Sequence, residues 1–136
     1  MLISSIIIKL IIILILINSV YLLKMIRREY SGICKDGIEI IYNNHLILNN
    51  NVMNEIIASL DIINEMKQES LQIDFTKEFV IVTTSHASNI RSNIVINNDQ
   101  IQFMTMTTRD YRSNLSYKIF IIEKLDYTKC NDIPLQ

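Results

Sequence analysis

The feature that most constrains this chain is an uncharged, mostly aliphatic run over residues 10–23, LIIILILINSVYLL. As a helix, these 14 residues would span about 21 Å, which is less than the roughly 30 Å hydrocarbon core of a bilayer. Extension to residues 8–26 lengthens the helix and leaves Lys9 and Lys24 near its ends, where their ammonium groups can reach the headgroups. The run therefore predicts a transmembrane anchor over residues 8–26.

Two other interpretations of this run are a cleaved signal peptide and a buried core helix. A signal peptide fits the length and the basic residue Lys9, but no Ala-x-Ala-like cleavage site follows. A core helix would be apolar along one stripe, whereas this run is apolar on every face. We therefore expect residues 1–28 to form an anchor or uncleaved signal with a basic flank, and residues 29–136 to form one small domain.

Charge divides the chain in the same place and limits the partners. All 14 acidic residues follow Arg28, together with nine of the 13 lysines and arginines, so this part carries a net charge of −5. Nucleic-acid binding needs a basic face, so this acidity argues against it. The predicted partners are a membrane, through residues 8–26, and an unidentified protein.

The orientation of the domain is predicted differently by two features. Basic residues concentrate on the domain side of the apolar run, which by the positive-inside rule places the domain in the cytoplasm. These residues are Lys24, Arg27, Arg28 and Lys35.

Cys34 and Cys130 favour the opposite side of the membrane. They lie in polar settings near the two ends of the domain, and domain termini are often close in space. A disulfide between them would close about 97 residues and stabilise the fold by roughly 4–5 kcal/mol. Because disulfides need an oxidising compartment, we expect the domain on the exported (periplasmic or extracellular) side, with the cytoplasmic face as the alternative.

The domain is predicted to be α+β. Residues 52–68 carry apolar side chains at helical spacing and form the clearest helix, with Asn50 or Asn51 as its cap. Short apolar or alternating segments predict strands, and Asn-rich turns join two pairs of them at Asn43-Asn44 and at residues 97–99. The predicted strands cover 38–42, 45–48, 78–84, 93–97, 100–107 and 116–125. The four strands that follow the predicted helix have no helices between them, which indicates an antiparallel meander with one amphipathic helix packed on it. Residues 27–37 are predicted to be a linker.

Two loops are candidate sites. Ser85, His86 and Ser88 follow a strand and form a weak catalytic alternative, because a serine nucleophile needs a neighbouring base. Arg109, Tyr111 and Arg112 occupy a loop between strands and are candidate partner contacts, since arginine and tyrosine are enriched at interfaces.

No motif predicts a cofactor or a metal. The two cysteines and two histidines lack C-x-x-C or H-x-x-H spacing, and no phosphate-binding glycine motif occurs. Asn114-Leu115-Ser116 matches the glycosylation acceptor pattern. We therefore expect a membrane-anchored, non-catalytic, protein-binding or accessory domain of the cell envelope. The alternatives are an immunity or inhibitor protein against a toxin or protease, and a small hydrolase that uses His86 and a nearby serine.

Overall fold

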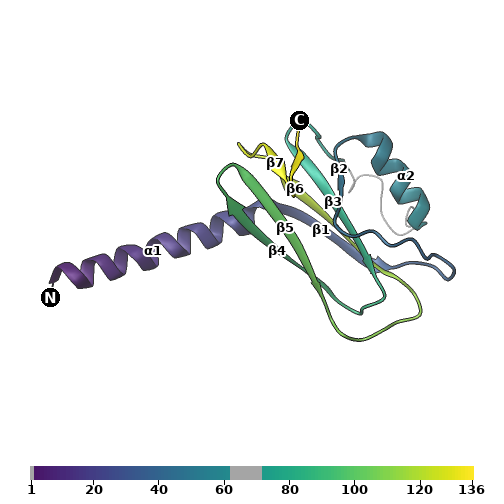
Figure 1. The fold of residues 1–136 in the computed structure, drawn as a ribbon, viewed down its shortest axis with the longest axis horizontal. Helices are drawn as coiled ribbons and strands as arrows, with labels where there is room; N and C mark the ends of the chain where they lie inside the picture. Colours follow the sequence, from purple (N-terminus) through teal and green to yellow (C-terminus); the bar gives the residue numbers. More distant parts are fainter. Residues whose placement is uncertain (1, 62–71) are drawn as a thin grey trace.

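Two helices and two four-stranded β-sheets make up the described part of the chain (Figure 1). The computed structural model describes residues 2–61 and 72–136, with the backbone alone at residues 18–24 and 27. The elements are α1 (Leu2–Met25), β1 (Ile26–Ile33), β2 (His45–Ile47), α2 (Asn50–Leu60), β3 (Glu78–Ser85), β4 (Ile90–Asn97), β5 (Gln100–Thr107), β6 (Ser116–Glu123), β7 (Lys129–Cys130) and β8 (Ile133–Pro134).

Helix α1 projects from the domain as a single rod (Figure 1). Its large aliphatic side chains up to Ile17 are 49–81% exposed, and Lys9 is the only charged residue over residues 2–17. At its C-terminal end, Met25 is fully buried between the sheets. None of the helices among the described residues is long and apolar enough to cross a membrane, so the span expected over residues 8–26 is not confirmed.

The first sheet has the order β1-β6-β3-β2, and all its pairs are antiparallel. Its two central strands, β3 and β6, are buried over almost their whole length on both faces. Strands of this kind are continuous apolar runs that need cover on each side. This requirement places the helix α2 on one face and the second sheet on the other.

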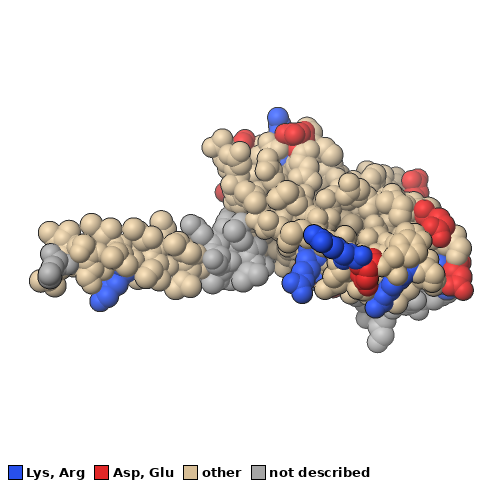
Figure 2. Space-filling model, turned by 60° about the horizontal axis from the view of Figure 1, so that its bottom comes forward, with Lys and Arg blue, Asp and Glu red and all other residues tan. Residues whose placement is uncertain are grey.

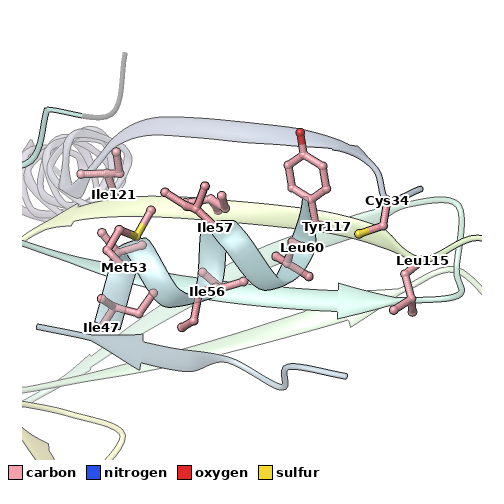
Figure 3. Packing of buried hydrophobic residues seen from close by; sticks show 12 residues of the cluster. Cys34, Ile47, Met53, Ile56, Ile57, Leu60, Leu115, Tyr117 and Ile121 are labelled. Atoms are coloured by element: carbon pink, nitrogen blue, oxygen red, sulfur yellow. The ribbon is translucent and has the colours of Figure 1, made fainter. Parts of the chain in front are cut away.

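Helix α2 covers the face formed by Ile47, Val80, Val82, Leu115, Tyr117, Ile119 and Ile121 (Figure 3). It buries Met53, Ile56, Ile57 and Leu60, which recur at helical spacing as the sequence predicted. Asn49, rather than Asn50 or Asn51, caps the helix by accepting a hydrogen bond from the Val52 N–H at 2.9 Å.

The helix ends at Leu60, where Asp61 adopts the left-handed conformation (φ 54°) that commonly terminates helices. The predicted helix extended to residue 68, and its apolar positions Ile63 and Met66 lie outside the described residues.

The second sheet, of order β4-β5-β7-β8, packs on the opposite face of the first sheet. Its core side chains Ile101, Phe103 and Cys130, with Leu135 just after β8, meet residues of β3 and β6. These include Phe120, whose ring centroid lies 4.9 Å from that of Phe103. The β4–β5 hairpin turns at Asn98 (φ 58°), so the hairpin predicted at residues 97–99 is confirmed.

The α+β class is confirmed, but three finer expectations were wrong. The strands do not form one meander, because β3 pairs with β6 and the intervening β4–β5 hairpin folds over as part of another sheet. Residues 27–37 are not a linker, since β1 pairs with β6 over Ile26–Ile33. Residues 38–42 are not a strand; the backbone N–H of Tyr42 donates to the side chain of Thr84 instead of joining a ladder.

The expected disulfide was also wrong. Neither Cys34 nor Cys130 forms a disulfide, and both are buried. Cys34 belongs to the core on the α2 side of the first sheet, and Cys130 belongs to the core between the sheets. The first sheet therefore separates the two thiols, and the termini of the domain do not bring them together.

Candidate functional site

Two loops of the domain lie against each other and form the candidate site. They are residues 86–89 between β3 and β4, and residues 108–115 between β5 and β6, which we call the loop pair. The Arg112 N–H donates to the His86 carbonyl at 2.6 Å, and the Thr108 N–H donates to the Asn89 carbonyl at 3.2 Å. These backbone bonds bring the two predicted site stretches side by side.

His86 uses both imidazole nitrogens to hold the loop pair together. Its Nδ1 lies 2.8 Å from the Arg112 carbonyl oxygen, and because a carbonyl only accepts, Nδ1 carries a proton. Its Nε2 lies 3.3 Å from Glu39 Oε2, which comes from the segment after β1. The ring stacks on Tyr111 with centroids 4.6 Å apart. His86 is thus a cross-link between three segments.

The two serines near His86 have other partners. Ser85 Oγ accepts a hydrogen bond from the Ala87 N–H at 3.0 Å. Ser88 Oγ lies 3.2 Å from the Thr108 hydroxyl. In the described part of the chain, the contacts of the His86 nitrogens go to Glu39 and Arg112, so no serine is paired with this base.

Asp110 fixes the conformation of the loop pair. Its carboxylate accepts hydrogen bonds from the Ser88 N–H at 3.1 Å and from the Thr108 hydroxyl. The hydrogen bonds from Ser88 and then Thr108 favour the ionised form and hold the pKa of Asp110 well below its usual range. The charged carboxylate is therefore part of the loop structure at neutral pH.

The predicted partner contacts lie on the surface of this loop pair. Arg109 and Arg112 are exposed, and Tyr111 is 75% exposed although its ring stacks on His86. Arg112 also lines a groove beside the loop pair.

The groove has a volume of about 180 Å³ and lies between the loop pair and the first sheet. It is lined by Ser31, Gly32, Ile33, Ser88, Asn89, Ile90, Arg112, Ser116, Tyr117 and Lys118. Lys118 is held there by an ion pair of 3.4 Å with Glu29 and by donating to the Ile90 carbonyl at 2.9 Å.

Ser116 lines this groove and is also the last residue of the glycosylation acceptor pattern Asn114-Leu115-Ser116. It is 7% exposed, and its Oγ is buried without a hydrogen-bond partner. The amide of Asn114 donates to Asp36 Oδ1 at 2.6 Å, so the side chain that the acceptor pattern would modify is occupied in the folded domain. Asn114-Leu115-Ser116 thus leads into β6, and the Asn114 side chain ties this part of the loop to Asp36.

Sequence reasoning missed Glu39, Ser116 and Lys118. Lys118 is a single charged residue within the mostly buried strand β6, and such a charge is a signal for a partnered group. The Glu39 side chain is 67% exposed, and no local signal indicated its contact with His86. Over residues 2–61 and 72–136, no group of three or more His, Cys, Asp or Glu side chains could hold a metal ion.

Comparison with known proteins gives no family for this chain. No protein-family model matches it, and neither the curated proteins nor the solved structures contain a significant match.

Proposed function

We propose that this protein is a membrane-attached, non-catalytic module that binds another protein through the 108–115 loop. The observation that carries the proposal is α1, whose large aliphatic side chains up to Ile17 are all exposed. In Figure 2 this helix projects from the domain, and the face in view is almost free of charged residues. Exposed apolar surface of this extent is unfavourable in water and is expected to lie against an apolar phase or a partner.

A lipid membrane is the phase that suits α1 best. The helix contains no acidic residue, and Lys9 is the one charged residue over residues 2–17. These features suit attachment to a membrane, although the helix, over its described residues, is not long and apolar enough to cross one. A protein partner would normally need an apolar stripe rather than apolar residues on all sides.

The loop pair supports a binding role rather than a catalytic one. Tyr111 and the two arginines combine a large exposed ring with positive charge on a loop that His86 and Asp110 hold in place. Both His86 nitrogens are engaged, which does not favour the hydrolase alternative. A partner that is a toxin or a protease would make the domain an immunity or inhibitor protein.

We place the domain on the cytoplasmic face as part of this proposal. The export argument depended on a disulfide, and Cys34 and Cys130 do not form one. The basic residues after the apolar run then remain the guide to orientation.

Charge in α1 tests the membrane attachment. The wild-type chain should stay in the membrane pellet after an alkaline carbonate wash. Ile12→Lys with Leu16→Lys should move it to the supernatant, since each charge costs about 2.5–3.5 kcal/mol in hydrocarbon. Ile12→Leu with Leu16→Ile is the matched control and should stay in the pellet. Release of the wild-type chain by the wash would contradict the proposal.

A photo-crosslinking amino acid at position 109 tests protein binding. In membranes of the source organism this probe should yield one discrete adduct. The amount of that adduct should fall when an excess of the protein without the probe is added. The same probe at Gln102, which is exposed on β5 away from the loop pair, is the control and should give none. Equal adducts from both positions, or none from either, would contradict binding by the loop.

A further inference from the structure

The groove between the loop pair and β1–β6 has the side chains of an anion site. Among the described residues, the charged ones that line it are Arg112 and Lys118, and both are cationic. The lining also contains the hydroxyls of Ser31, Ser88 and Ser116 and the amide of Asn89, of which the Ser88 hydroxyl already contacts Thr108. This lining combines positive charge with neutral hydrogen-bond donors.

Lys118 is held in place for such a role. Its ammonium has three N–H donors, of which one goes to the Ile90 carbonyl and one faces Glu29. The ammonium also lies 5.5 Å from the centroid of the Phe120 ring, and the side chain is only 20% exposed, so the positive charge is held at the groove before any ligand binds.

Arg112 is anchored through its backbone, and its guanidinium can contact a ligand. Its backbone N–H and carbonyl bond His86, which fixes the residue beside the groove. Among the described residues, no hydrogen bond or ion pair involves its side chain. A guanidinium pairs with carboxylate or phosphate oxygens through two parallel hydrogen bonds.

Ser116 adds an independent indication. Its hydroxyl is buried without a partner, and such a group costs free energy that a ligand oxygen would recover. We propose that this groove binds a small oxyanion, a carboxylate or phosphate group held by Arg112, Lys118 and Ser116. The volume of about 180 Å³ is below the roughly 300–1,000 Å³ typical of drug-sized ligands, which limits the ligand to a small anion or the end of a longer one.

This site goes beyond the proposed function, because it requires neither membrane attachment nor a protein partner. The full chain in a neutral detergent is titrated with inorganic phosphate and, separately, with acetate at constant ionic strength. The amide resonances of Ser116 and Lys118 are followed by NMR. We expect a saturable shift with at least one anion; preference for phosphate or for acetate then identifies the chemical class.

Variants assign the shift to the groove. Arg112→Gln should weaken binding about tenfold or more, because it removes charge-assisted hydrogen bonds. Arg109→Gln is the matched control on the same loop, does not line the groove, and should change affinity less than about twofold. Ser116→Ala should weaken binding, and Glu29→Gln should strengthen it by freeing the Lys118 ammonium.

Two results would overturn the proposal. One is the absence of a saturable shift with both anions. The other is an equal loss in Arg109→Gln and Arg112→Gln, which would indicate general attraction to a basic loop. Native-like amide spectra of each variant keep a folding defect separate from a loss of binding.

Discussion

At the residue scale, the two cysteines show how neighbouring residues mislead. Cys130 lies between Lys129 and Asn131, and these polar residues suggested an exposed thiol. In the fold, β7 pairs with β5 and points the Cys130 side chain into the core between the sheets. Burial disfavours the thiolate and raises the pKa of Cys130 to about 12 from an ordinary 9.0.

This pKa predicts a loss of stability in alkali. The unfolded thiol ionises near 9.0 and the folded one near 12, so the stabilisation is complete below pH 9 and is lost as the pH rises toward 12. Each pH unit above 9 should lower the free energy of unfolding by about 1.4 kcal/mol more in wild type than in Cys130→Ala. Urea unfolding at pH 8, 9 and 10 with a non-thiol reductant measures the difference, and parallel curves would refute the prediction.

Asp110 predicts the opposite dependence in acid. Because the pKa of this carboxyl is lowered in the fold, its stabilisation is present above the ordinary value of 3.8 and declines as the pH falls toward the folded-state value. Asp110→Asn should therefore destabilise the domain at pH 7, and the difference from wild type should begin to shrink only as the pH falls below about 3.8. Amide exchange of Ser88, whose N–H bonds this carboxylate, should accelerate in the variant at pH 7. Unchanged exchange would contradict the role assigned to Asp110.

At the element scale, the pairing of β1 with β6 depends on a close approach. A Cβ at Gly32 would lie 2.6 Å from the hydroxyl oxygen of Tyr117, and this tyrosine is only 3% exposed. Gly32→Ala should therefore lower the free energy of unfolding by about 1–3 kcal/mol through overpacking. In a Tyr117→Leu background the same change should cost clearly less. Equal costs in the two backgrounds, measured by urea unfolding, would show that the contact is not the cause.

The elements themselves were predictable where one pattern dominates. The bounds of β5 over Gln100–Thr107 and the buried face of α2 followed from alternation and helical spacing. The β1 strand was not predictable in this way, because Arg28, Glu29 and Ser31 give it a polar sequence. Its pairing also depends on β6, about ninety residues later. Long-range pairing of this kind leaves little local signal.

At the scale of the whole molecule, the site depends on the three-layer arrangement. The sequence singled out both loops, but their contact requires the β4–β5 hairpin to fold over the first sheet. The groove depends on the long-range pairing of β1 with β6 as well, because β1, β6 and both loops each supply part of its lining. Spacing along the chain therefore indicated loop residues but could not indicate the groove.

The orientation of the whole molecule gives the last prediction. Gln102 is exposed on the outer face of the second sheet, so a cysteine there would react with a membrane-impermeant maleimide wherever the domain meets the reagent. If the domain faces the cytoplasm, Gln102→Cys should label only after the cells are permeabilised. Wild type, whose two thiols are buried, should label slowly in both cases and serves as the control. Rapid labelling in intact cells would place the domain outside, and export would then require a reason other than a disulfide between Cys34 and Cys130.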